Sequence, residues 1–244
     1  VFILTDDQDL VLGSMSVMPQ TRAALVEGGT MFPVAAPSVP VCCPSRSSLV
    51  TGQYQHNTLA LNNSIPGNCA GEAWREGPEQ FNFGARLAAR GYLTQYIGKY
   101  LNQYGMPAAG GLEHIPAGWD RAQGAAIGGW FGLKGNSKYL NYTLSNQGVA
   151  EAHGADFAAD YLPTLIHNRT ISFIKYAVSQ NKPFFAVAST PSCHQAAIPE
   201  PKYAQLLPNA TAPRVPNYRV PNADSHWLAR EQDYTKMDEN AAEW

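Results

Sequence analysis

The first stretch whose side chains could do chemistry is residues 42–52, with the sequence CCPSRSSLVTG. Cys42 and Cys43 lie between two prolines, and a helix can follow them, with Ser45 as its candidate N-cap. A cysteine just before a helix N-terminus, with Arg46 close by, lies in a positive field that favours an anion. This chemistry predicts a nucleophile for an anionic substrate. The alternative is a structural cysteine buried in a turn.

Two adjacent carboxylates, Asp6 and Asp7, follow the apolar run at residues 1–4, which we expect to form a buried parallel strand. Ligands of open α/β sheets bind at the carboxyl ends of the strands. Paired carboxylates at such a position are costly unless a cation neutralises them, and hard divalent cations prefer oxygen ligands. The pair therefore indicates a metal site, with a solvated acidic turn as the alternative.

Two further candidates also come directly after expected strands. Lys99 follows the strand expected at residues 92–97, and His194 follows the buried strand expected at residues 184–188. A lysine at such a position is usually exposed to solvent, and a lone loop histidine is weak evidence of a site. Because parallel strand ends meet at one edge of a sheet, however, Lys99 could bind an anion there, and His194 is a third candidate site residue beside the acidic pair.

The elements that must position these groups are strands and helices in alternation, which indicates an α/β fold. Besides the three strands named above, we expect a strand at residues 30–36 and helices at residues 18–28, 83–90 and 160–179. Residues 105–142 are rich in Gly, Trp and Tyr and are expected to form a long ordered loop, either a sugar-binding rim or a cover for the sheet edge. Prolines after residue 199 predict an irregular surface segment, with weak helical character at residues 224–244.

Composition limits the classes of function. The chain has 244 residues, 45% of them hydrophobic, which is enough for one substantial core. The formal net charge is −2 and gives no indication of a nucleic-acid partner. No apolar run approaches the roughly 20 residues that a membrane-spanning helix needs. Because the sequence opens on the first expected strand, without an initiator methionine or signal peptide, we expect it to begin inside a longer precursor.

Four Asn-x-Ser/Thr sequons favour a protein of the secretory pathway with glycans on surface loops. They lie at Asn62, Asn141, Asn168 and Asn209. The cysteines are compatible with that compartment. If Cys42 is modified, at most one internal disulfide can form among Cys43, Cys69 and Cys193, and the sequence does not say which pair.

The stretch at Cys42 resembles the motif of the sulfatase family, Cys-x-Pro-Ser-Arg followed by Thr-Gly at fixed spacing. The matching residues are Cys42, Pro44, Ser45, Arg46, Thr51 and Gly52. The runs at residues 98–102, 110–116 and 136–143 resemble the branch of the family that acts on glucosamine 6-sulfate, to which some arylsulfatases are related. The resemblance extends from Val1 to about residue 228. It implies the alkaline-phosphatase-like α/β sandwich, with a mainly parallel central sheet between helices.

The resemblance also implies how the nucleophile is made. Cys42 is expected to be oxidised to formylglycine by a formylglycine-generating enzyme during maturation. Asp6, Asp7 and the modified Cys42 are expected to bind one Ca²⁺ per active site. Arg46 is expected to hold the modified side chain.

For the substrate, the resemblance implies a sulfate ester of the aryl sulfate or glucosamine 6-sulfate type, in a sulfated small molecule or glycan. Lys99 is expected to bind the sulfate, and His194 to donate a proton to the leaving oxygen. Two features depart from the usual family pattern. Leu101 replaces a histidine found in many members, and Gln195-Ala196 replaces the usual Ser-Pro, which puts the shape of the loop after His194 in doubt.

Family members are longer, and they complete the calcium site with an Asp-Asn pair and bind sulfate with a second lysine far downstream. No Asp-Asn step follows His194 here. We therefore expect residues 1–244 to be the N-terminal part of the catalytic domain, active only with a C-terminal remainder, which could be a separate chain. The expected location is extracellular, in a cell wall, or lysosomal. Two alternatives stay open: a phosphoester or phosphonate hydrolase on the same fold, and a non-catalytic sulfatase-derived structural or binding protein.

Overall fold

The computed structural model describes residues 1–8, 10, 13–209, 216, 220, 223–224 and 227–230. Residues 1–8 and 34–198 form one compact unit, and residues 9–33 and 199–244 belong to a second. The sequence contains no clear sign of this division. Every residue proposed for catalysis or metal binding lies in the first unit.

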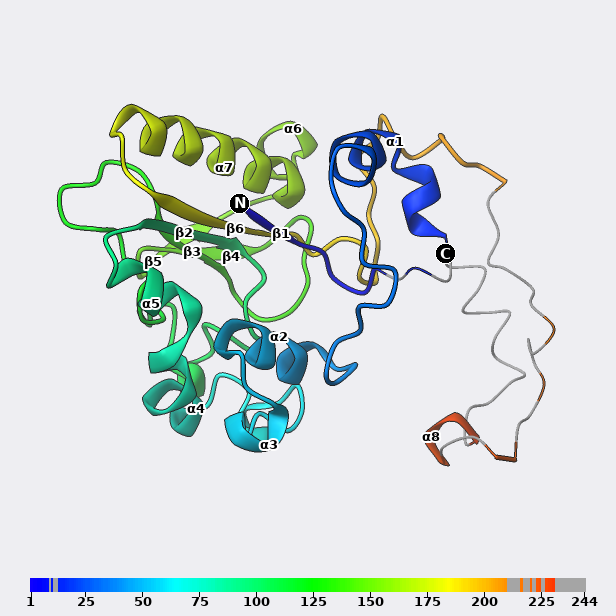
Figure 1. The fold of residues 1–244 in the computed structure, drawn as a ribbon, viewed down its shortest axis with the longest axis horizontal. Coiled ribbons are helices and arrows are strands. Elements are labelled where there is room, and N and C mark those ends of the chain that lie inside the picture. Colours follow the sequence, from blue (N-terminus) through cyan, green and yellow to red (C-terminus); the bar gives the residue numbers. More distant parts are fainter. Residues whose placement is uncertain are drawn as a thin grey trace. The chain divides into compact units, whose positions relative to one another are not determined.

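A six-stranded sheet with the order β1-β6-β2-β3-β4-β5 forms the centre of the first unit (Figure 1). The strands are β1 (Phe2–Leu4), β2 (Leu93–Gly98), β3 (Gly129–Leu133), β4 (Thr143–Asn146), β5 (Val149–Ala152) and β6 (Phe184–Ser189). The pairs β1–β6, β6–β2 and β2–β3 are parallel, whereas β3–β4 and β4–β5 are antiparallel. The parallel strands expected near residues 1–4, 92–97 and 184–188 are thereby confirmed.

Part of the segment expected to be a loop is a strand. β3 lies within residues 105–142 and pairs with β2 from Gln95↔Gly129 to Gly98↔Gly132. Its sequence, GWFGL, contains two glycines, which are depleted in strands, so the local pattern does not show it. The prediction of a loop was wrong there because pairing with β2, rather than local propensity, determines the structure.

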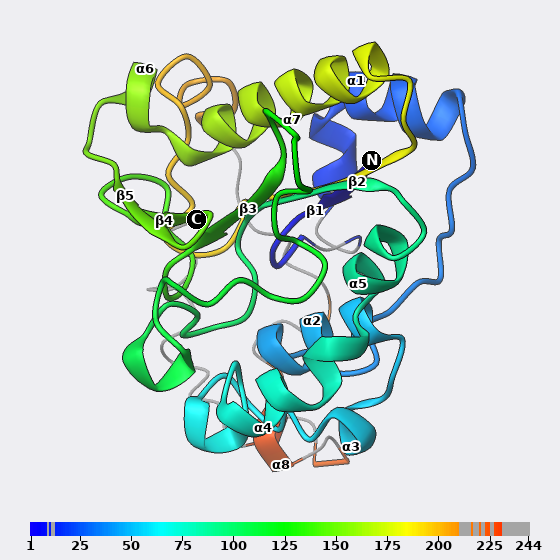
Figure 2. The same cartoon turned by 90° about the vertical axis from the view of Figure 1, so that its left-hand side faces the viewer.

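Helices cover both faces of this sheet (Figures 1 and 2). On one side are α6 (Phe157–Asp160) and α7 (Leu162–Ser179); on the other are α2 (Cys42–Thr51), α4 (Glu72–Glu76) and α5 (Phe83–Ala88), with α3 (Gln55–Thr58) following α2. The buried positions of α7 recur every three or four residues, as in an amphipathic helix packed on a sheet. The helices expected at residues 83–90 and 160–179 are confirmed.

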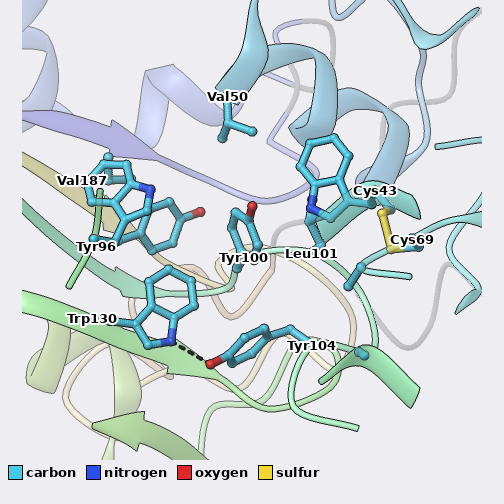
Figure 3. Close-up of a cluster of buried hydrophobic side chains, with 13 residues drawn as sticks. Cys43, Val50, Cys69, Tyr96, Tyr100, Leu101, Tyr104, Trp130 and Val187 are labelled. Carbon is cyan, nitrogen blue, oxygen red and sulfur yellow. Dashed lines mark hydrogen bonds between the residues drawn. A yellow bond between two sulfur atoms is a disulfide. The ribbon is translucent and has the colours of Figure 1, made fainter. Parts of the chain in front are cut away.

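Successive residues of β2 face two different cores, as alternation along a strand requires. Tyr96 packs with Trp130 and Tyr104 in an aromatic cluster on the side of α2 and α4 (Figure 3). Within it, Trp130 Nε1 donates a hydrogen bond to the Tyr104 hydroxyl, at 2.6 Å. Ile97 faces the opposite side and packs with Ile166 of α7. The two cores hold β2 rigidly, so the residue at its carboxyl end has a fixed position.

β1 is an edge strand and is only partly covered. Val1 is 60% exposed and Ile3 is 63% exposed, so the expectation of a buried strand was wrong. The reason is that β1 pairs with β6 alone among the described residues. An exposed apolar edge of a sheet favours pairing or packing with another segment.

A disulfide joins Cys43 of α2 to Cys69. The sequence alone did not say which pair of cysteines would form it. Neither Cys42 nor Cys193 forms a disulfide among the described residues.

In the second unit, α1 (Pro19–Thr21) continues into a wider helical segment at Arg22–Glu27, which confirms the helix expected at residues 18–28. Residues 30–36 do not form the expected strand. Pro33 lacks a backbone N–H for a sheet there. Residues 201–209 form turns, as expected, and α8 spans Trp227–Arg230, while the remaining part of the prediction for residues 224–244 lies outside the described residues. No helix in the described part of the chain is long and apolar enough to cross a membrane.

Candidate active site

Three parallel strands deliver polar residues to one edge of the sheet. β1 is followed by Asp6, β2 by Lys99, and β6 by residues 190–198, here named the His194 loop. Their backbones are tied together: the Lys99 N–H donates to the Ser189 carbonyl at 3.0 Å, and the Asp6 N–H donates to the Ser192 carbonyl at 2.7 Å. The expectation that these strand ends meet is confirmed.

Gly98 allows β2 and β6 to come close together just before Lys99. Its φ is +106°, and a Cβ at this position would lie 1.9 Å from the Ser189 carbonyl oxygen. Any side chain would force the two strand ends apart, and glycine alone adopts this conformation readily. Gly98 therefore fixes where the Lys99 side chain begins.

Asp6 lies at the centre of a buried ion cluster, named here the Asp6 cluster, made of Asp6, Arg46, Lys99 and Ser137. Its carboxylate, in a residue 4% exposed, lies 2.5 Å from Lys99 Nζ and 3.2 Å from Arg46 Nη2. Ser137 Oγ donates to the same carboxylate at 2.7 Å. Burial by itself would raise the pKa of Asp6, but the charges of Arg46 and Lys99, with hydrogen bonds from Lys99 and Ser137, lower it.

Because Asp6 stays ionised, the buried part of this cluster carries two cations against one anion. The excess positive charge can attract an anionic ligand. Lys99 is 1% exposed, so it is not the solvated lysine that its sequence context left open.

Arg46 reaches from α2 to the strand ends. Its Nη1 donates to the Lys99 carbonyl at 2.7 Å and to Ser189 Oγ at 2.9 Å. Ser189 Oγ in turn donates to the Lys99 carbonyl at 2.6 Å. These bonds hold the guanidinium in place, so Arg46 joins the helix that carries Cys42 to the strand that carries Lys99.

Cys42 is the first residue of α2, and Val41 is the N-cap. The expectation that Ser45 caps this helix was wrong: Ser45 lies in the first turn, and its N–H donates to the Val41 carbonyl at 2.9 Å. The Cys43 N–H is bound by Asn63 Oδ1 at 2.8 Å. Cys42 is half-buried at a helix N-terminus, where backbone N–H groups favour negative charge.

Asp6, Asp7 and Cys42 offer potential ligand atoms that all lie within 4.8 Å of one another. Carboxylate oxygens suit Ca²⁺, which takes about six to eight oxygen ligands. A thiol is a poor ligand for this hard cation, but an oxygen-bearing derivative of Cys42 would suit it. The three residues therefore fit one side of a calcium site, and the other ligands must come from elsewhere.

His194 reaches the site from the third strand end. Its Nδ1 lies 2.6 Å from the Gln195 carbonyl oxygen, which can only accept, so Nδ1 carries a hydrogen. Its Nε2 lies 3.7 Å from Asp7 Oδ2. Nε2 is thus the ring atom that can exchange a proton beside the acidic pair.

Sequence reasoning missed three side chains that hold this site together. They are Ser137, Tyr139 and Ser189. Ser189 could have been found from the sequence, because it is a polar residue at the carboxyl end of β6, next to the strand end of β2 at Gly98. Ser137 and Tyr139 lie in the segment expected to be a loop, and no local pattern shows which elements they contact.

The four sequon asparagines are exposed, as glycan attachment requires. Asn62, Asn141 and Asn209 lie outside helices and strands. Asn168 lies on α7 rather than on a loop.

Comparison with known proteins agrees with the geometry. The sulfatase family model matches residues 1–241, so the chain belongs to the sulfatase family. N-acetylglucosamine-6-sulfatase of Homo sapiens is 42% identical over 232 residues, which are 95% of this chain and 40% of that protein. The extracellular sulfatase SULF-1 homolog of Drosophila melanogaster is 40% identical over 233 residues, which are 94% of this chain and 20% of that protein. The chain thus spans less than half the length of these relatives.

The fold also matches solved structures. One is that of a protein in complex with its substrate D-glucosamine-2-N,6-O-disulfate, with a TM-score of 0.59 and 18% identity, covering 89% of this chain and 39% of that chain. This likeness concerns the fold, and it confirms the alkaline-phosphatase-like α/β class expected from the sequence.

Proposed function

We propose that residues 1–244 are the N-terminal part of the catalytic domain of a sulfatase that hydrolyses sulfate esters of the aryl sulfate or glucosamine 6-sulfate type. The observation that carries the proposal is the Asp6 cluster, whose excess positive charge lies beside Asp7 and Cys42. A sulfate ester is an anion and needs such a charge at the reacting group. The names of the relatives support sulfate as that anion.

Cys42 is the proposed nucleophile position. When it is oxidised to formylglycine by a formylglycine-generating enzyme and hydrated, it supplies an oxygen nucleophile. Ca²⁺ held by Asp6, Asp7 and this residue would supply further positive charge beside the sulfate. Arg46 keeps the Asp6 carboxylate turned towards the site through its 3.2 Å contact.

Lys99 and His194 act on the substrate in this proposal. The Lys99 ammonium, fixed by Asp6 and by Ser137 Oγ at 3.0 Å, stabilises negative charge on the transferred sulfate. His194 Nε2 donates a proton to the leaving oxygen. Both groups are already close to the acidic pair, so little rearrangement is needed for them to act together.

The rest of the catalytic domain is proposed to cover the β1 edge. Ile3 is 63% exposed at this edge. An open pocket of about 470 Å³ lies at the end of β1 and is lined by residues that include Leu4, Ser48 and Leu49. The relatives contain long segments that this chain does not match. We expect these segments, in the same or a separate chain, to complete the metal site and the sheet.

The proposed environment is the secretory pathway, with an extracellular, cell-wall or lysosomal destination. Exposed sequons at Asn62, Asn141, Asn168 and Asn209 and the Cys43–Cys69 disulfide support it.

The test uses the full-length protein that contains this chain, produced together with a formylglycine-generating enzyme. Sulfate release is measured from 4-methylumbelliferyl sulfate and from glucosamine 6-sulfate, with the corresponding phosphate esters as controls. We expect sulfate release to exceed phosphate release, and Cys42→Ala to abolish it while the thermal unfolding midpoint stays unchanged. Near wild-type activity of Cys42→Ala, or a preference for phosphate, would contradict the proposal.

A further inference from the structure

The His194 loop is attached firmly at its start. The Thr190 N–H donates to the Leu4 carbonyl at 3.0 Å, and the Cys193 N–H donates to the Asp6 carbonyl at 2.7 Å. The His194 ring has weaker support of its own. Its Nδ1 bonds to Gln195 of the same loop, and its Nε2 is 3.7 Å from an exposed carboxylate. The direction of the ring therefore depends on how the loop backbone is held.

Tyr139 holds that backbone at the histidine itself. Its hydroxyl donates to the His194 carbonyl at 2.9 Å and to the Pro191 carbonyl at 3.2 Å, so one hydrogen is shared between two acceptors. Burial raises the pKa of this phenol to about 12, which keeps the hydroxyl a donor at any pH near neutrality.

The ring of Tyr139 is itself fixed. It is 4% exposed and stacks on Tyr161, with 6.2 Å between ring centroids and an interplanar angle of 22°. The Tyr139 carbonyl accepts from the Leu162 N–H at the start of α7, at 2.9 Å. A side chain held at the ring and at the backbone can set the position of a loop to within tenths of an ångström, which proton transfer requires.

We propose that Tyr139 is a positioning residue for proton transfer from His194. As the nucleophilic oxygen at position 42 forms a bond to sulfur, the S–O bond to the leaving group breaks and its electron pair stays on the leaving oxygen. The His194 ring, protonated at both nitrogens, delivers its Nε2 proton to that oxygen. Tyr139 fixes the backbone from which Nε2 is aimed. Ser137, two residues earlier, bonds Lys99 and Asp6, so one short segment holds both the anion-binding and the proton-donating sides. This role rests on the proposed function.

The test is Tyr139→Phe in the full-length, matured enzyme, with two substrates that differ in leaving group. A phenolate leaves 4-methylumbelliferyl sulfate with little need of a proton, whereas the sugar alcohol of glucosamine 6-sulfate needs one. We expect kcat for the sugar ester to fall about 10- to 100-fold, and kcat for the aryl ester to change by less than about twofold, since general acid catalysis contributes about 10²–10⁴-fold. Both rates come from one preparation, so their ratio does not depend on the fraction that folds.

Two further variants make the result specific. Tyr161→Phe removes the hydroxyl that donates to the Ile198 carbonyl at 2.8 Å but keeps the stacked rings, and we expect it to leave the ratio within about twofold of wild type. His194→Ala removes the proton donor, so its loss of kcat for the sugar ester is the largest loss that Tyr139→Phe can cause through His194.

Three outcomes would overturn the role of Tyr139. In the first, Tyr139→Phe slows both esters equally. In the second, it leaves both rates unchanged while His194→Ala lowers kcat for the sugar ester. Either result removes the positioning role and leaves the proposed function standing. In the third, the wild-type enzyme hydrolyses neither ester, and the proposed function itself fails.

Discussion

Asp6 and Glu79 are both buried carboxylates, 4% and 1% exposed, but they have different surroundings. Glu79 Oε1 accepts from Trp74 Nε1 at 3.0 Å and from the Tyr100 hydroxyl at 2.9 Å. Its Oε2 lies 2.5 Å from His114 Nε2. Asp6 instead has two cationic partners, Arg46 and Lys99, and an exposed acidic neighbour, Asp7.

The difference shows that burial of a charge does not by itself mark a functional site. The partners of Glu79 are aromatic or close in sequence, and burial raises the pKa of Tyr100 well above its usual value, so that phenol is a permanent neutral donor. That site is closed, because Glu79 and its partners Trp74 and Tyr100 are almost completely buried. The Asp6 cluster has an excess of positive charge and opens towards Asp7 and Cys42, so it can exchange partners with a ligand.

The largest expected contrast is between Asp6→Asn and Glu79→Gln in the full-length enzyme. Asp6→Asn leaves Arg46 and Lys99 buried without their anion, which should cost about 3–5 kcal/mol of folding free energy. It should also lower kcat by about 10²–10³-fold. Glu79→Gln should cost about 1–3 kcal/mol and leave kcat within twofold. Urea unfolding measures the folding free energy, and sulfate release measures kcat. An equal loss of kcat in the two variants would show that the Asp6 and Glu79 sites do not differ in function.

A smaller change tests the excess charge itself. Lys99→Met removes one cation but leaves Arg46 to compensate Asp6, so we expect a folded protein whose kcat falls about 10²-fold. Lys175→Met, at an exposed position of α7, is the matched control and should have wild-type kinetics. Steady-state kinetics with 4-methylumbelliferyl sulfate would show the difference. Equal activity of the two variants would mean that Lys99 does not contact the reacting sulfate.

The smallest expected effect is the acid dependence of the Asp6 cluster. The pKa of Asp6 is lowered in the folded protein from the ordinary value of 3.8, so its stabilisation is complete above that value and is lost as pH falls through the lower folded pKa. The difference in unfolding free energy between wild type and Asp6→Asn should therefore be constant above about pH 5 and shrink below it. Urea titrations at several pH values measure this difference. If this difference in unfolding free energy instead grew as the pH fell, the predicted direction of the pH dependence would be wrong.

Much of the sheet and the site could be predicted because they depend on local patterns and one topological rule. The apolar runs of β2 and β6 give their strands, and the meeting of parallel strand ends brings Asp6, Lys99 and His194 together. β3 could not be predicted, because its two glycines hide the local strand pattern and only its pairing with β2 makes it a strand.

Contacts between distant segments explain the other errors. α2 begins at Cys42 rather than after Ser45. At this start, the Cys43 N–H donates to Asn63 Oδ1, 20 residues away in the chain. Ser137 reaches Asp6 across 131 residues, and no periodicity carries such information. The sequence identifies which residues can do chemistry, but the residues that orient them appear only once the chain is folded.

The most direct test of the central claim is the mass of the tryptic peptide that contains Cys42, residues 23–46, from full-length protein that hydrolyses sulfate esters. We predict the mass deficit of an aldehyde in place of the thiol at Cys42, with Cys43 released intact on reduction of its disulfide. We also predict that activity rises in proportion to the fraction of peptide that carries the aldehyde. An unmodified thiol at Cys42 in a fully active preparation would contradict the account.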